Sequence, residues 1–119
     1  MTGKAPPPPS PLPVFKAEFF KALGHPVRIR ILEVLVAGER SVQELQEALD
    51  LEQPVVSQHL AMLRAKNIVK ARKQGTAVRY TVRDASLGEL LQVARRIFDN
   101  QLIHSQTMLR ELRREGRRR

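Results

Sequence analysis

Cysteine is absent from this chain of 119 residues, and its absence excludes several chemistries at once. Without a thiol there can be no disulfide, no thiolate metal site and no cysteine nucleophile. Aromatic residues are also scarce, with four Phe, one Tyr and no Trp. Leu, Ile, Val and Ala must therefore build the core, which favours a mainly helical protein.

Long hydrophobic runs are missing as well. The longest, residues 31–37, is interrupted by Glu33 and is far too short to span a membrane. The N-terminal residues carry a lysine and a proline tract where a signal peptide needs an apolar stretch. We therefore expect a cytoplasmic protein with no membrane partner. Its length suits one domain.

Acidic residues are too few to balance the basic ones. The chain has 21 Lys and Arg against 12 Asp and Glu, a formal net charge of +9. Residues 53–83 contain seven basic residues and no acidic one. A charge run is usually a solvated face, but this stretch also carries core apolar positions. It therefore indicates a surface for a polyanion, with nucleic acid favoured over an anionic membrane.

The two ends of the chain differ in composition from its middle. Six prolines in residues 1–13 predict an extended, disordered arm, because proline cannot donate backbone hydrogen bonds. Its P-x-x-P spacing leaves an SH3-type ligand as an alternative. The C-terminal arginines predict fraying beyond Glu115 and a disordered basic tail over residues 113–119. Residues 14–112 are then the folded domain.

Apolar spacing and capping residues predict three helices before residue 50. The phenylalanines at 15, 19 and 20 recur at helical spacing in a first helix, which ends at Gly24. Pro26 opens a second, central helix that ends at Gly38. Ser41 and Glu44 fit a capping box for a third helix, which runs to Leu49.

The remaining pattern predicts a fourth helix, a hairpin and a long last helix. Val56, Leu60 and Leu63 form the buried stripe of a helix that runs from about residue 53 to 66. Residues 68–82 have the pattern of two strands around a glycine turn. Asp84 or Ser86 caps the last helix, whose apolar stripe is too long for so small a domain to cover. A partner helix would cover it.

A short helix, a tight turn and a second helix with an exposed polar face are the parts of a helix-turn-helix. The basic hairpin that follows would be its wing. In that arrangement amides such as Gln58 read base edges in the major groove, and Ser57 binds bases or phosphates. Ordinary packing of the third and fourth helices in a bundle is the alternative. The acid-free stretch favours DNA binding.

Three segments resemble the arsenical-resistance repressor family (ArsR/SmtB-like) of winged-helix regulators. They are F-K-A-L-G-H-P-V-R-I-R-I-L at 20–32, Q-P-V-V-S-Q-H-L-A-M-L-R at 53–64 and V-K-A-R-K-Q-G-T-A-V-R-Y at 69–80. The likeness extends over roughly residues 15–103. It implies a mainly α winged helix-turn-helix with a small β-hairpin wing, which dimerises through its first and last helices and binds an inverted-repeat operator.

The resemblance also implies which residues contact DNA. At the start of the recognition helix they are Gln53, Val55, Ser57, Gln58 and His59. On the wing they are Arg72, Lys73, Gln74 and Arg79. Arg64 joins them as a basic residue of the recognition helix. Glu52 departs from the family pattern, because relatives often have a serine N-cap there and an acid is unfavourable beside phosphates.

The metal sites of the family carry over poorly. The cysteine-bearing site falls on residues 41–43, which offer no thiolate. The site between the last helices keeps only Asp84, with Ser86, Ile97 and Asn100 at its other positions. Of the histidines, His25 suits a capping role and His59 a hydrogen bond or DNA. His104, near Asp99, is the candidate ligand for nickel or zinc across a dimer.

The sequence therefore predicts a homodimeric, sequence-specific, DNA-binding transcription regulator. Its effector is unknown, and repression is the default direction that the resemblance implies. It is not an enzyme, because no phosphate-binding loop, G-x-S-x-G elbow or H-E-x-x-H motif is present. The alternative is a non-specific nucleic-acid-binding or architectural protein, or an RNA binder. The scarcity of aromatics for stacking counts against single-stranded ligands.

Overall fold

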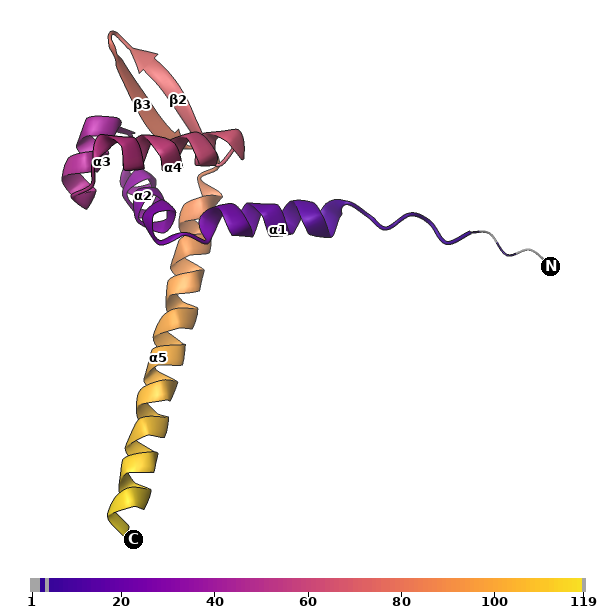
Figure 1. Ribbon diagram of the computed structural model, residues 1–119, viewed down its shortest axis with the longest axis vertical. Helices are drawn as coiled ribbons and strands as arrows, with labels where there is room; N and C mark the ends of the chain where they lie inside the picture. Colours follow the sequence, from indigo (N-terminus) through magenta and orange to yellow (C-terminus); the bar gives the residue numbers. More distant parts are fainter. Residues whose placement is uncertain (1–2, 4, 119) are drawn as a thin grey trace. The chain divides into compact units, whose positions relative to one another are not determined.

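A computed structural model describes residue 3 and residues 5–118, and contacts divide the chain into two compact units, Met1–Arg83 and Asp84–Arg119. The second unit contains one helix, α5 (Ser86–Arg118). Figure 1 shows the elements of the first unit, which are, in chain order, α1 (Leu12–Leu23), α2 (Pro26–Ala37), β1 (Arg40–Ser41), α3 (Val42–Leu49), α4 (Gln53–Ala65), β2 (Val69–Gln74) and β3 (Ala77–Val82). The mainly helical class with a β-hairpin is confirmed.

Local side-chain contacts explain where α2 and α3 begin. The imidazole Nδ1 of His25 accepts a hydrogen bond from the Val27 backbone N–H at 3.1 Å, so the capping role predicted for His25 is confirmed. At α3 the Ser41 hydroxyl accepts from the Glu44 backbone N–H at 3.1 Å. The Glu44 carboxylate in turn accepts from the Ser41 N–H at 3.0 Å. The predicted capping box is therefore present, and it satisfies two backbone donors that the helix itself leaves without partners.

The core of the first unit is aliphatic. Helix α2 is central to it, with Ile31 and Leu32 wholly buried. Leu35 of the same helix is also buried. The remaining core residues come from α1, α3, α4 and the start of the hairpin, and they are Ala22, Leu23, Leu45, Leu49, Val56, Leu60, Leu63, Ile68 and Val69. The stripe predicted for α4 is thus the face that packs inward, which leaves the opposite face of that helix for other contacts.

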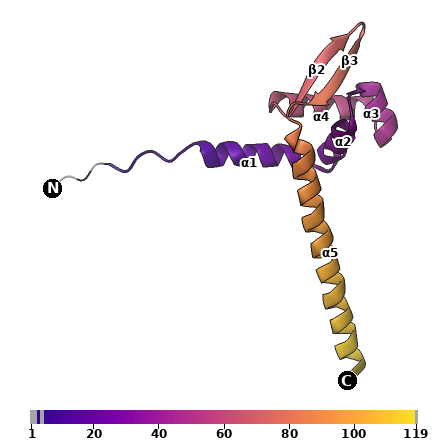
Figure 2. The same ribbon diagram turned by 180° about the vertical axis from the view of Figure 1, so that it is seen from behind.

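The sheet has three antiparallel strands in the order β1-β3-β2. Strands β2 and β3 pair from Val69↔Val82 to Gln74↔Ala77, and Gly75 in the turn has a φ of 62°, which favours glycine. This hairpin is the predicted wing, and Figure 2 shows it extending away from α3 and α4. Strand β1 was not predicted, because two residues are too few to form a pattern.

Two helix boundaries differ from the sequence-based expectation. Helix α1 begins at Leu12, inside the predicted arm, because proline in the first turn costs no hydrogen bond. Helix α5 continues to Arg118, past Glu115, where fraying was expected. Arginine is a good helix former, and positive charge is favourable at a helix C-terminus. Disorder at the two ends stays a prediction. No helix among the described residues is long and apolar enough to cross a membrane.

Helices α1 and α5 each carry exposed apolar side chains. On α1 these are Leu12, Val14, Phe15 and Phe20. On α5 they are Val93, Ile97, Phe98, Leu102, Ile103, Met108, Leu109 and Leu112. Most of those on α5 recur every three or four residues, so they form a stripe along the helix. A single copy of the chain leaves this apolar surface exposed to water.

Candidate nucleic-acid interface

Helices α3 and α4 form the helix-turn-helix. Asp50 ends α3 in the left-handed conformation, with a φ of 54°, and α4 begins at Gln53 with Pro54 in its first turn. Glu52 is the N-cap of α4 and makes no side-chain capping bond, as its departure from the family pattern suggested. The turn is therefore short, and the buried stripe of α4 fixes which of its faces points outward.

One flank of α4 faces the wing. The Gln53 side-chain amide donates to the Ser57 hydroxyl at 2.9 Å, one turn further along the helix. Ser57 and Arg64 line a hollow of about 430 Å³, together with Leu60, Ala61, Ala65 and, from β3, Tyr80. Hydroxyl, guanidinium and phenol groups thus line one depression between the recognition helix and the wing. All three can donate hydrogen bonds to a phosphate.

The outermost side of α4 presents Gln58, which is exposed, and Val55 lies half-buried beside it. Met62 continues this surface with 44% of its area exposed. An exposed amide and nearby apolar groups suit base edges and thymine methyl groups in a major groove. Of the residues predicted at the reading face, Gln53 and Gln58 are exposed, whereas Val55, Ser57 and His59 are half-buried.

His59 lies on the other flank, turned toward the start of α2. Its ring centroid is 4.3 Å from that of His25, and its Nδ1 is 3.3 Å from the Nη1 of Arg28. The Nε of Arg28 also donates to the Ala22 carbonyl at the end of α1. Burial, the charge of His25 and the charge of Arg28, in that order, lower the pKa of His59 below its ordinary value. His59 thus joins α4 to α1 and α2 as a neutral ring.

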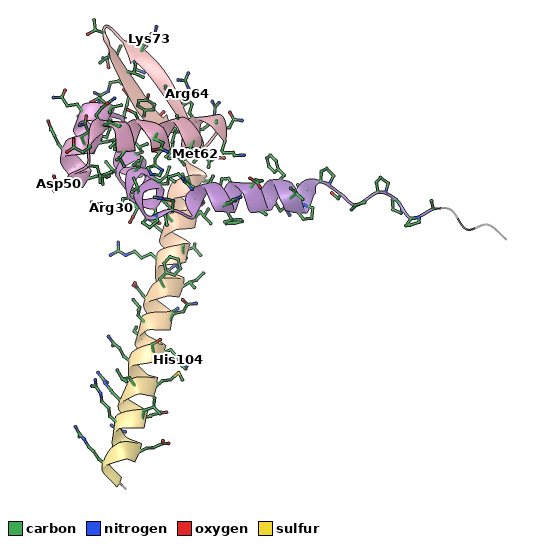
Figure 3. The ribbon with its side chains drawn as sticks, viewed as in Figure 1. Arg30, Asp50, Met62, Arg64, Lys73 and His104 are labelled. Carbon is green, nitrogen blue, oxygen red and sulfur yellow. The ribbon has the colours of Figure 1, made fainter. Side chains whose placement is uncertain are left out.

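The basic residues of the hairpin are of two kinds. Lys73 and Gln74 lie at the exposed end of β2, and Figure 3 shows Lys73 near the far end of the wing and Arg64 on α4. Among the residues that the structure describes, no carboxylate lies within ion-pair distance of Lys73 or Arg64. Lys66, by contrast, pairs with Glu18 at 3.6 Å.

Arg72 and Arg79 lie opposite each other where β1 pairs with the hairpin, a part that we call the base of the wing, and they are bound to acids that precede and open α3. The Glu39 carboxylate accepts from Arg72 at 2.6 Å and from Arg79 at 2.9 Å. The Glu44 carboxylate accepts from Arg79 at 2.7 Å. We call these four residues the wing-base cluster. Arg79, which was predicted as a DNA contact, is the most heavily paired cation of the hairpin.

The pKa values of the wing-base cluster reflect this pairing. Burial alone would raise the pKa of Glu39, but hydrogen bonds and charges from Arg72 and Arg79 lower it overall. The hydrogen bond from the Ser41 backbone lowers the pKa of Glu44, and Arg79 adds to the effect. The hydrogen bond to Glu39 raises the pKa of Arg79. All three groups are therefore charged at neutral pH.

A metal centre does not form within this chain as far as it is described. No three His, Cys, Asp or Glu side chains come together among those residues. His104 is exposed on α5, where Figure 3 labels it, and Asp99 lines a shallow surface with Gln92, Arg95 and Arg96.

Sequence reasoning missed three residues of this interface. Tyr80 was counted only as the lone tyrosine, although it lies on β3 and lines the hollow beside α4. Glu39 had no sequence signal, because its partners lie 33 and 40 positions away. Arg28 was included in a resembling segment without a role. Contacts between residues so distant in the chain leave no periodic pattern in the sequence.

Comparison with known proteins places these features in a family. Residues 25–71 match the arsR family of bacterial regulatory proteins. The chain is 45% identical over 107 residues to an uncharacterized HTH-type transcriptional regulator of Mycobacterium tuberculosis, Rv0081, covering 89% of this chain and 94% of that protein. It is 39% identical over 79 residues to a probable mercury resistance operon repressor of Streptomyces lividans, covering 66% and 63% of the two chains.

Solved structures agree with this assignment. The crystal structure of M. tuberculosis Rv0081 matches with a TM-score of 0.75, covering 82% of this chain and 98% of that one. The solution structure of a homodimeric winged helix-turn-helix DNA-binding domain of Mycobacterium bovis is 28% identical. It matches with a TM-score of 0.73, covering 87% of this chain and 95% of that domain.

The fold, the exposed recognition helix and this similarity over nearly the whole chain lead to one identification. The family consists of DNA-binding transcriptional regulators and not of enzymes. The chain belongs to the ArsR family of winged helix-turn-helix transcriptional regulators.

Proposed function

We propose that this regulator binds a specific duplex operator as a homodimer, with α4 in the major groove and the wing on the flanking backbone. The observation that carries the proposal is the position of two cations beside α4. Arg64 and Lys73 flank its exposed polar side, and no described carboxylate neutralises either of them. A surface of that charge and shape suits duplex DNA.

Base reading falls to the exposed part of α4. Gln58 pairs with a base edge through its amide, and Val55 contacts a thymine methyl group. Gln53 donates a hydrogen bond that holds the Ser57 hydroxyl in place. Ser57 therefore loses little conformational entropy when it contacts a base or a phosphate. The contacts of Gln58 and Val55 to bases discriminate between base pairs, whereas contacts to phosphate only set the position of the protein.

Phosphate binding falls to the hollow and to the tip of the wing. The sugar–phosphate backbone lies in the hollow between α4 and β3, where Arg64 and Tyr80 donate to phosphate oxygens. Lys73 and Gln74 contact the next phosphates, and Arg72 adds its charge from the base of the wing. We assign His59 and Arg79 to positioning, because Nδ1 of His59 and all three side-chain nitrogens of Arg79 already have hydrogen-bond partners within the protein.

The second copy of the chain covers the apolar surface of α1 and α5. Phe98 and Leu102 of α5 are more than half exposed in one copy, and so is Phe20 of α1. Burial of such side chains favours association. A two-fold dimer would present two recognition helices about one helical turn of DNA apart, which predicts an inverted-repeat operator.

Repression is the proposed direction, supported by the repressor named among the relatives. The protein would act in the cytoplasm, on promoter DNA. The metal response predicted from His104 belongs to the same proposal as an effector, with nickel or zinc held between two copies. The assignment of DNA contacts to α4 and the wing does not depend on the direction of regulation or on the identity of the effector.

The experiment is fluorescence anisotropy with a labelled duplex from upstream of the gene for this protein, at physiological salt. A scrambled duplex is the competitor, and if the upstream duplex fails, a duplex selected from a random library replaces it. We expect binding to be at least about a thousandfold tighter than to the scrambled duplex. Equal, salt-sensitive binding to every duplex would contradict the proposal and favour the architectural alternative.

Two additions to the same titration test its parts. Leu102→Asp should give a monomer in sedimentation and lose operator affinity, whereas Asn100→Ala, on the opposite side of α5, should not. Nickel or zinc added after chelator should weaken operator binding in wild type and leave a His104→Gln variant unaffected. An unchanged affinity in wild type would remove the metal from the proposal and leave DNA binding standing.

A further inference from the structure

The wing-base cluster places two like charges directly opposite each other. Arg72 and Arg79 are partners in the register of β2 and β3. Cross-strand pairs of like charge destabilise a sheet. Glu39 relieves the repulsion, because one carboxylate oxygen, Oε1, accepts from Arg72 at 2.6 Å and from Arg79 at 2.9 Å. The hairpin thus depends on an acid that lies outside it.

That acid belongs to the helix-turn-helix side of the molecule. Glu39 directly precedes β1, and Ser41 of β1 is the register partner of Arg79. The Glu39 carbonyl also accepts from Arg79, at 3.2 Å. Glu44 adds a second link, because its Oε1 accepts both from Arg79 and from the capping Ser41 N–H. The start of α3 and the base of the wing therefore share one network of hydrogen bonds.

We propose that Glu39 is a positioning residue for DNA binding, which fixes the angle between the wing and the helix-turn-helix by bridging Arg72 and Arg79. The proposal rests on the proposed function. Glu39 then strengthens the binding of DNA, although its negative charge repels phosphate. The favourable effect dominates because a free hairpin loses orientational freedom on binding, whereas a braced one has already lost it.

Substitution of Glu39 distinguishes this positioning role from the opposite one, in which Glu39 weakens DNA binding. If Glu39 competed with DNA for the two arginines, Glu39→Gln would strengthen binding by removing a negative charge. As a brace, Glu39→Gln weakens binding, because a neutral amide oxygen holds the two guanidinium groups less strongly than a carboxylate oxygen and no longer offsets their mutual repulsion. Glu47→Gln is the matched control: it removes the same charge from exposed α3, where Glu47 has no ion pair among the described residues.

The binding experiment uses anisotropy on the operator duplex of the preceding section in two lengths. The long duplex includes the base pairs beyond the half-sites that the wings reach, and the short one lacks them. We expect Glu39→Gln to bind the long duplex about fivefold more weakly than Glu47→Gln, as loss of exposed ion pairs suggests. On the short duplex the two variants should agree. A general loss of fold would weaken binding to both.

A double-mutant cycle adds a second criterion. Arg79→Gln should weaken binding to the long duplex as much as Glu39→Gln does, and the double variant should weaken it no further. Tighter binding by Glu39→Gln, or equal binding by Glu39→Gln and Glu47→Gln, would overturn the proposal. So would additive losses, since they would mean that Arg79 contacts DNA on its own.

Hydrogen exchange tests the brace without DNA. In Glu39→Gln the amides of Arg79 and Tyr80 should exchange about fivefold faster than in Glu47→Gln, while those of α4 stay unchanged. Equal exchange in the two variants would overturn the brace, whatever the DNA results. If wild type prefers no duplex, the proposed function fails, and this measurement alone decides on Glu39.

Discussion

Two groups of polar side chains in the first unit, Met1–Arg83, differ in whether they are bonded to other parts of the protein. Gln58 and Lys73 point into solvent, and neither appears in a described ion pair. His59 and Arg79, on the same helix and the same hairpin, are half-buried and bonded to other parts of the protein. Proximity along the chain is therefore no guide to role. The residues free to meet DNA stand beside residues that hold the reading surface in place.

The largest expected effect lies on the exposed side. Gln58→Ala should weaken specific operator binding by about 1–3 kcal/mol, the usual value of a good side-chain contact to a base. Binding to scrambled DNA should stay unchanged, because phosphate contacts are intact. Anisotropy on both duplexes measures the difference, and Gln106→Ala is the amide control on α5. An equal loss on both duplexes would show that Gln58 does not read bases.

The next effect concerns a residue that is bonded to other parts of the protein, and it is an effect on stability. Ser41→Ala removes the hydroxyl that caps α3 and should lower the free energy of unfolding by about 1 kcal/mol. Thermal unfolding followed by circular dichroism measures it. Ser105→Ala, on exposed α5, is the control and should not lower stability. No loss in Ser41→Ala would mean that the capping box does not stabilise α3.

The smallest effect is a pH dependence that arises from His59. Its pKa is lowered in the folded protein, so the unfolded chain binds the proton more readily. Its contribution to stability is complete above the ordinary value of about 6.5 and falls as the pH drops toward the folded pKa. His59→Asn keeps an acceptor for Arg28 but does not titrate. In this variant the free energy of unfolding, measured from pH 8 to about pH 5, should therefore depend less on pH than in wild type. An unchanged slope would contradict the assignment.

Sequence reasoning reached the fold because the fold depends on local patterns. The α4 stripe of Val56, Leu60 and Leu63, the Ser41 capping box and the glycine turn are each readable within a few residues. The positions of His59 and Arg79 depend on partners in other elements, on α2 and before β1. The resemblance predicted DNA contacts for both residues, and only the packed structure shows that each also bonds to another element of the protein.

The most direct test of this division is the salt dependence of operator binding by wild type, Lys73→Gln and Arg79→Gln. Each phosphate contact contributes about 0.9 to the slope of log affinity against log salt. We predict that Lys73→Gln lowers the slope by about that amount and that Arg79→Gln leaves it unchanged. A slope lowered equally by both, or lowered only by Arg79→Gln, would contradict the separation of DNA-facing residues from braced ones.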